Sequence, residues 1–136
     1  MNASTQTPSR EIASTIRHQI TPGVLMSLGA HDIGAGRIAH EQGGPMLPSL
    51  IFKALILPFN KNGERSERPR KMFVIVSLTP ADTYKITVTY NANVGNGRGP
   101  DRTDHYHATD VYAEDLARVL LALDYDGDTV LNPRYI

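Results

Sequence analysis

Two histidines separated by one residue are the first group in this sequence that could bind a metal. His105 and His107 lie in the segment Asp104–Thr109, whose pattern predicts a short strand. Alternate side chains of a strand share a face, so both imidazoles would lie side by side and Asp110 would supply a third ligand for zinc or a similar ion. The alternative is a polar, exposed edge strand. We favour the exposed edge strand, because only the histidine pair indicates a metal site and the third ligand is assumed. We therefore expect no cofactor.

The second candidate site is a cluster of basic side chains in a polar loop. The loop spans residues 60–71 and carries five cations, Lys61, Arg65, Arg68, Arg70 and Lys71. Basic loops can bind the phosphate backbone of nucleic acids. Glu64 and Glu67 lie within the cluster and weaken its field, so a solvated loop is the favoured interpretation and nucleic-acid binding the alternative.

Other catalytic arrangements find little support in the sequence. The chain has no cysteine, which excludes thiolate metal sites, disulfides and cysteine nucleophiles. The glycine-rich segment 29–37 lacks the Gly-Lys-Ser/Thr ending of a phosphate-binding loop. No serine stands in a recognisable nucleophile–base pattern. These observations favour a protein that is not an enzyme.

Two amphipathic helices are expected, one near each end of the chain. Thr7-Pro8 begins the first, and Ile12, Ile16 and Ile20 form its apolar stripe before Thr21-Pro22-Gly23 ends it. Leucines and a valine at helical spacing predict the second over Ala113–Leu123, with Asp110 as its cap.

Between the helices the pattern predicts four strands and a possible fifth. They are Val24–Leu28, Ser49–Leu57, Met72–Leu78, Thr83–Tyr90 and Asp104–Thr109. The clearest is Thr83–Tyr90, where apolar and polar residues alternate as in a half-buried strand. Thr79–Asp82 predicts a tight hairpin turn, because Pro80 suits the second position of a type I turn.

These elements predict one α+β domain over residues 1–136, with a single antiparallel sheet of four to five strands and both helices on one of its faces. Residues 1–7 are expected to be flexible, and 29–48, 58–71 and 91–103 to be long loops. The net charge is zero, although residues 101–136 carry three basic and eight acidic side chains. No segment is apolar for long enough to span a bilayer and no signal peptide is visible, so we expect a cytoplasmic protein without a membrane partner.

Several short motifs resemble a family of small uncharacterised proteins carried by bacteriophages and other mobile elements. They are Leu25-Met26-Ser27-Leu28-Gly29-Ala30, the run Ser77–Tyr84, and Val111-Tyr112-Ala113-Glu114-Asp115-Leu116. The chain departs from the family at Thr21-Pro22 and at His31, where lysine is usual. The resemblance implies an accessory gene of a phage in a bacterial host, and carries over no catalytic residue.

Three functions remain open at this point. The first is a non-enzymatic protein that binds a host or phage protein, for example to inhibit a host defence. The second is nucleic-acid binding through the loop 60–71, and the third a small metal-dependent enzyme using His105 and His107. A homodimer is also conceivable, because an open sheet leaves edges that need covering.

Overall fold

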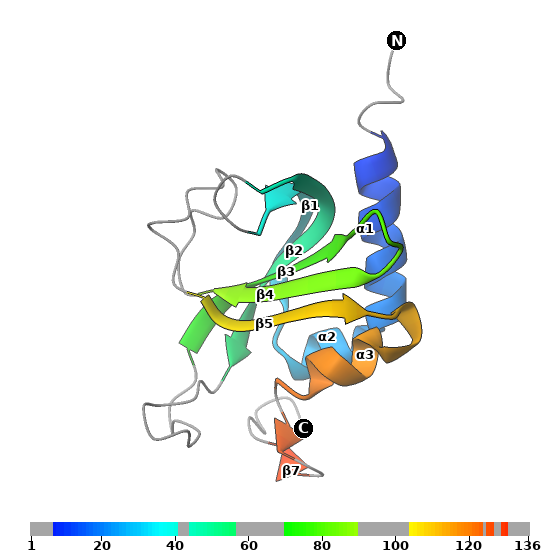
Figure 1. Cartoon of the computed structure of the whole chain (residues 1–136). Coiled ribbons are helices and arrows are strands. Elements are labelled where there is room, and N and C mark those ends of the chain that lie inside the picture. The colour runs from blue at the N-terminus through cyan, green and yellow to red at the C-terminus, as the bar shows by residue number, and fades with distance from the viewer. Residues whose placement is uncertain are drawn as a thin grey trace.

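The computed structural model describes residues 7–40, 44–56, 70–89, 104–123, 125–126 and 129–130. One antiparallel sheet has its strands in chain order: β1 (His31–Ala39), β2 (Met46–Ile56), β3 (Arg70–Leu78), β4 (Tyr84–Thr89) and β5 (Asp104–Val111). The helices are α1 (Thr7–Ile20), α2 (Pro22–Ser27) and α3 (Ala113–Leu121), and β6 (Tyr125–Asp126) pairs with β7 (Thr129–Val130). The predicted α+β class, with its single antiparallel sheet, is confirmed (Figure 1).

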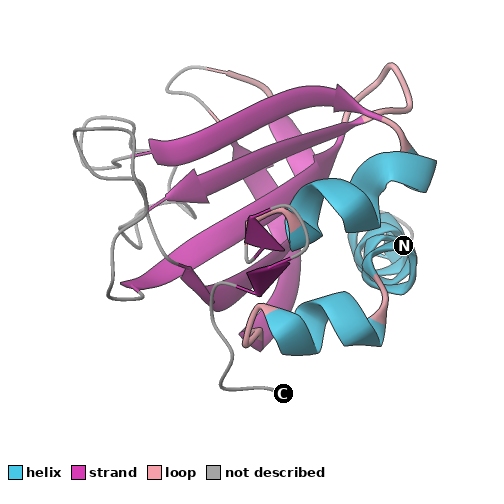
Figure 2. Ribbon diagram, turned by 90° about the horizontal axis from the view of Figure 1, so that it is seen from below, coloured by secondary structure: helices cyan, strands magenta, loops and turns pink. Residues whose placement is uncertain are grey.

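The three helices cover the same face of the sheet, and the main core lies between them and the strands (Figure 2). The apolar stripe predicted for α1 points into this core, where Ile16 and Ile20 are fully buried. Even-numbered residues of β2 and β3, such as Phe52 and Val74, meet them from the sheet. Burying such side chains supplies most of the driving force for folding. No helix in the described ranges is long and apolar enough to cross a membrane.

The segment predicted as the first strand, Val24–Leu28, is helical instead. Pro22 occupies the start of α2, and the Thr21 hydroxyl accepts a hydrogen bond from the Val24 N–H at 3.4 Å. A short apolar run fits a strand and a buried helix equally well, so its pattern cannot distinguish between these two structures. The Thr-Pro pair that ends α1 also begins α2, as threonine caps and proline at the first position do.

The prediction of a long loop over residues 29–48 was also wrong, because most of this segment belongs to the strands β1 and β2. β1 pairs with β2 through Gly34, Ala35 and Gly36, which lie opposite Ile51, Leu50 and Ser49. Glycine lowers strand propensity but does not prevent backbone pairing. Pairing with β2, the next strand in the chain, therefore outweighed the local composition.

The hairpin between β3 and β4 is confirmed. The Asp82 N–H donates to the Thr79 carbonyl at 3.0 Å, and Asp82 has a positive φ of 65°. β3 begins at Arg70, two residues before the predicted Met72, so Arg70 and Lys71 belong to a strand rather than to the basic loop.

The strand β5 and the helix α3 are confirmed, but Asp110 does not cap the helix. Tyr112 occupies the N-cap position without a side-chain hydrogen bond, and Asp110 lies within β5 with a φ of 56°. The predicted loop 91–103 lies outside the described residues, as do residues 57–69 and the start of the chain up to residue 6.

Candidate functional site

A buried histidine lies on the face of the sheet opposite the helices, which we call the helix-free face. His40 follows β1 and is 3% exposed. Its Nδ1 lies 2.6 Å from the Thr87 hydroxyl of β4, and its Nε2 lies 2.5 Å from the Ser77 hydroxyl of β3. Thr87 and Ser77 are fully buried. His40 therefore covers Thr87 on the polar face of β4.

The donor and acceptor in each hydrogen bond of this network follow from the Ser49 hydroxyl. The Ser49 hydroxyl donates its only proton to the Leu47 carbonyl at 2.8 Å, so it must accept from the Ser77 hydroxyl, 2.5 Å away. The Ser77 oxygen in turn must accept from His40. The Nε2 atom of His40 therefore carries a proton.

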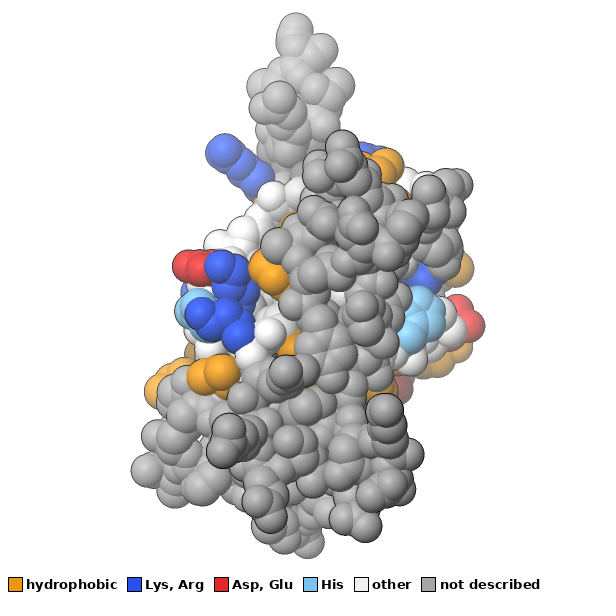
Figure 3. Space-filling model, turned by 90° about the vertical axis from the view of Figure 1, so that its left-hand side faces the viewer, with side chains coloured by type: hydrophobic (Ala, Val, Ile, Leu, Met, Phe, Trp, Pro, Cys, Tyr) orange, Lys and Arg blue, Asp and Glu red, His pale blue; other side chains and the backbone are white. Residues whose placement is uncertain are grey.

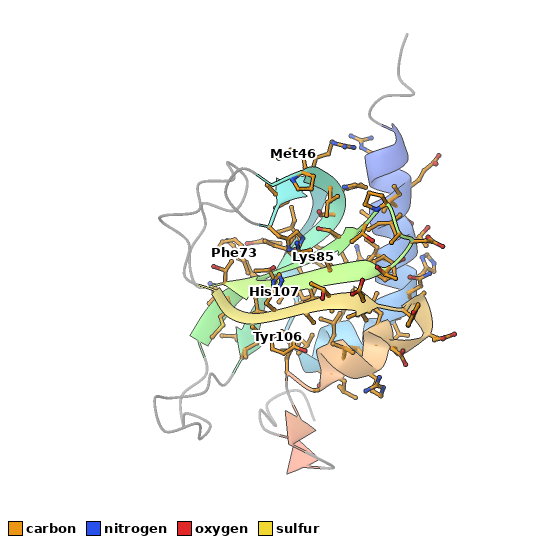
Figure 4. All side chains as sticks on the ribbon, in the orientation of Figure 1. Met46, Phe73, Lys85, Tyr106 and His107 are labelled. Carbon is orange, nitrogen blue, oxygen red and sulfur yellow. The ribbon has the colours of Figure 1, made fainter. Side chains whose placement is uncertain are left out.

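The network continues to the protein surface on the other side of the imidazole. In neutral His40 the Nδ1 atom is an acceptor, so the Thr87 hydroxyl donates to it. The Thr87 oxygen then accepts from Nδ1 of the exposed His107, 3.1 Å away, and the two imidazole centroids are 6.5 Å apart. His107 comes from β5, which pairs with β4, the strand of Lys85, while Phe73 lies one strand further on in β3 (Figure 4).

This polarity is opposite to the one that activates a serine. A serine nucleophile gives its proton to a histidine base, whereas here His40 donates to Ser77. The Ser77 hydroxyl is also fully buried, out of reach of a substrate. The network therefore stabilises the packing of β1 against β3 and β4 and does not form a nucleophile–base pair.

A groove between α1 and β1 lies on one flank of the N-terminal helix. It encloses about 230 Å³. Its floor is apolar (Ala13, Ile33 and Leu50), and Arg10 and Arg17 of α1 also line it. Both arginines are exposed, and neither forms an ion pair with any residue that the structure describes. We call this cavity the α1–β1 groove.

The strand on the other wall of the groove has a free edge. Within the described ranges β1 pairs only with β2 and ends the sheet, and its residues Gly34 and Ala35 are exposed. Arg37 lies opposite Pro48, which has no N–H. This indicates a non-hydrogen-bonded pair, so the backbone N–H and C=O groups of Arg37, and of Ala35 two residues earlier, point away from β2. They are available to another strand.

A charged cluster ties the start of β1 to the neighbouring strands. Lys53 Nζ lies 3.0 Å from the Asp32 carboxylate and 5.6 Å from the centre of the Phe73 ring. The hydrogen bond and charge of Lys53 lower the pKa of Asp32 below its usual value. Figure 3 shows basic side chains beside an acidic one on this side of the molecule. The cluster holds the irregular start of β1, between His31 and Gly34, against β2.

The basic residues predicted to bind nucleic acid are described only in part. Lys61, Arg65 and Arg68 lie outside the described residues, and of Arg70 only the place in β3 is known. Lys71 is exposed and lies opposite Leu55 of β2. The nucleic-acid hypothesis therefore stays a prediction.

The arrangement of the described residues also gives no support to the metal hypothesis. His107 uses Nδ1 in its contact with Thr87, and Asp110 is exposed within an irregular stretch of β5. The side chain of His105 is outside the described part. Among the side chains that are described, no three histidine, aspartate or glutamate residues approach closely enough to hold a metal ion.

Neither His40 nor the groove arginines stood out in the sequence. His40 lies in the segment predicted to be a loop, and Arg10 and Arg17 were merely polar positions of α1. Comparison with protein-family models, with curated proteins and with solved structures gives no match. The candidate function therefore rests on the groove itself.

Proposed function

We propose that this protein is a non-enzymatic protein-binding module whose α1–β1 groove receives an extended, acidic segment of a partner protein. The observation that carries the proposal is the combination found in this groove. A strand edge with outward backbone groups faces two arginines that have no described acidic partner. Edge strands bind extended peptides through main-chain hydrogen bonds, and adjacent side chains supply specificity.

The spacing of the arginines defines which peptide would fit. Arg10 and Arg17 are two helical turns apart, about 10.5 Å along α1. Acidic residues four positions apart on a strand are separated by about 13 Å and share one face. The flexible arginine side chains can span the difference. The residue midway between the two acids would face the apolar floor formed by Ala13 and Leu50.

The favoured ligand is therefore an extended segment with the pattern acid–any–small apolar–any–acid. In the setting that the sequence motifs suggest, a phage gene in a bacterial cell, such a segment would belong to a host or phage protein. An inhibitor of a host defence protein would act in this way, by occupying the segment.

Binding of a labelled peptide to the full chain tests the proposal. The probe is acetyl-Thr-Glu-Thr-Val-Thr-Glu-Thr-amide, measured by fluorescence anisotropy at low salt. Exposed ion pairs contribute about 0.2–1 kcal/mol each, so replacing both Arg10 and Arg17 with glutamine should weaken binding roughly 2- to 30-fold. A peptide N-methylated at its central valine, which loses one strand donor, should bind more weakly still.

Arg118→Gln is the matched control. Arg118 is exposed on α3, pairs only locally with Asp115, and does not line the groove. It should leave the affinity unchanged. Equal loss in Arg118→Gln and in the groove variants, or equal binding of the N-methylated peptide, would count against the groove. Preferential binding of a single-stranded oligonucleotide, lost on charge reversal of Arg65, Arg68 and Arg70, would favour the nucleic-acid alternative.

A further inference from the structure

A second cavity lies on the opposite flank of α1 from the groove. It encloses about 320 Å³ between α1, the β3–β4 hairpin and the first residue of α3. Ile12, Leu78 and Ala113 form its apolar walls. We call it the α1–hairpin pocket.

Three of the polar residues that line this pocket can accept hydrogen bonds, namely Asp82, Thr15 and Tyr84. The fourth, Gln19, also carries amide donors. Tyr84 donates its own proton to Gln19 Oε1 at 2.5 Å, which leaves its oxygen able to accept. No lysine or arginine lines the pocket, and Asp82 forms no ion pair with the residues that the structure describes.

The Asp82 side chain places a negative charge near Tyr84 in this lining. Burial and the nearby Asp82 carboxylate both raise the pKa of Tyr84, so the charge of Asp82 acts on the phenol. The N-terminus of α3, next to Ala113, has the opposite sign. Glu114 and Asp115 in the first turn of α3 offset that positive end.

We infer that the α1–hairpin pocket binds an alkylammonium group, either a free primary amine or a lysine side chain. An ammonium has three N–H donors and no acceptor, which matches Asp82, Thr15 and Tyr84 as three acceptors around one cavity. The alkyl chain would lie along the apolar walls. This site is separate from the α1–β1 groove and does not depend on the function proposed for the groove.

Titration of the isotope-labelled full chain with n-butylammonium, followed by NMR, tests the inference. The expected result is a saturable shift of the backbone amides of Ile12, Thr15 and Ala113. n-Butanol, which has the same alkyl chain without the charge, should shift them much less. Equal shifts with n-butanol, or no saturable shift at these amides, would overturn the inference.

Two variants test whether the charge of Asp82 is responsible for binding the ammonium group. Asp82→Asn keeps a residue type that tolerates a positive φ and should weaken the affinity for n-butylammonium roughly two- to fivefold. Asp110→Asn is the matched control, since Asp110 is also exposed with a positive φ but lies outside the pocket, and it should have no effect. An equal effect of both substitutions would overturn the assignment, and the comparison with n-butanol stands even if a variant fails to fold.

Two further ligands distinguish the sources of the ammonium group. Acetyl-Ala-Lys-Ala-amide should bind if the pocket takes a lysine of a partner protein, and its ε-acetylated form should not. Binding of n-butylammonium without binding of the lysine peptide assigns the pocket to small free amines.

Discussion

Replacing Ser77 with alanine perturbs the hydrogen-bond network on the helix-free face at one atom. Ser77 is fully buried, and its hydroxyl accepts from His40 Nε2 and donates to Ser49. Alanine has nearly the same shape, so the cavity is small, but the N–H of His40 loses its acceptor. An unsatisfied buried polar group costs about 1–3 kcal/mol. We therefore expect the free energy of unfolding to fall by about 2 kcal/mol.

Urea denaturation at neutral pH, followed by far-UV circular dichroism, measures this loss. With a typical urea dependence for a small domain, the midpoint should fall by roughly 1 M. The control is Ser14→Ala, the same substitution at an exposed position of α1. Alanine favours helix there, so the midpoint should stay or rise slightly. A Ser77→Ala midpoint that matches the control would refute the network as we describe it.

Three more predictions follow from individual groups. ¹⁵N NMR of the histidine rings should show neutral His40 protonated at Nε2 and neutral His107 protonated at Nδ1, and a His40 ring protonated at Nδ1 alone would reverse the inferred direction of the network. The pKa of Asp32 is lowered in the folded protein, so the stability from its pair with Lys53 should be present above the unfolded pKa near 3.8 and disappear as the pH falls through the folded pKa. The stabilities of wild type and Asp32→Asn should therefore converge in acid denaturation curves. The raised pKa of Tyr84 acts in the other direction: its stabilisation is present below pH 10.0 and is lost as the pH rises through the folded pKa, so Tyr84→Phe should lose less stability than wild type in alkaline unfolding experiments.

The elements that local chemistry specifies could be predicted from the sequence. α1 has a regular apolar stripe, and the β3–β4 hairpin combines alternating strands with a proline turn. Each of these signals lies within about 20 residues. α2 and β1 could not be predicted in this way. The run Val24–Leu28 suits two structures, and the glycine-rich β1 is a strand only because β2 pairs with it.

The α1–β1 groove and the burial of His40 depended on the unpredicted strand β1. The α1–β1 groove exists because β1 lies beside Arg10 and Arg17, and His40 is buried because β1 brings it over β3 and β4. The α1–hairpin pocket joins residues more than 60 positions apart, such as Gln19 and Tyr84. No spacing along the chain signals such pairs. The histidine pair and basic loop stood out in the sequence because their residues are neighbours there.

The most direct test of the central proposal is a charge exchange across the α1–β1 groove. The double variant Arg10→Glu, Arg17→Glu should lose binding of the acidic peptide and gain binding of acetyl-Thr-Lys-Thr-Val-Thr-Lys-Thr-amide, and the gain should fall as salt is added. Recovery of binding by the exchanged pair is the result that we predict. If the folded variant binds neither peptide, or if its affinity for each peptide equals that of wild type, the groove is not the binding site.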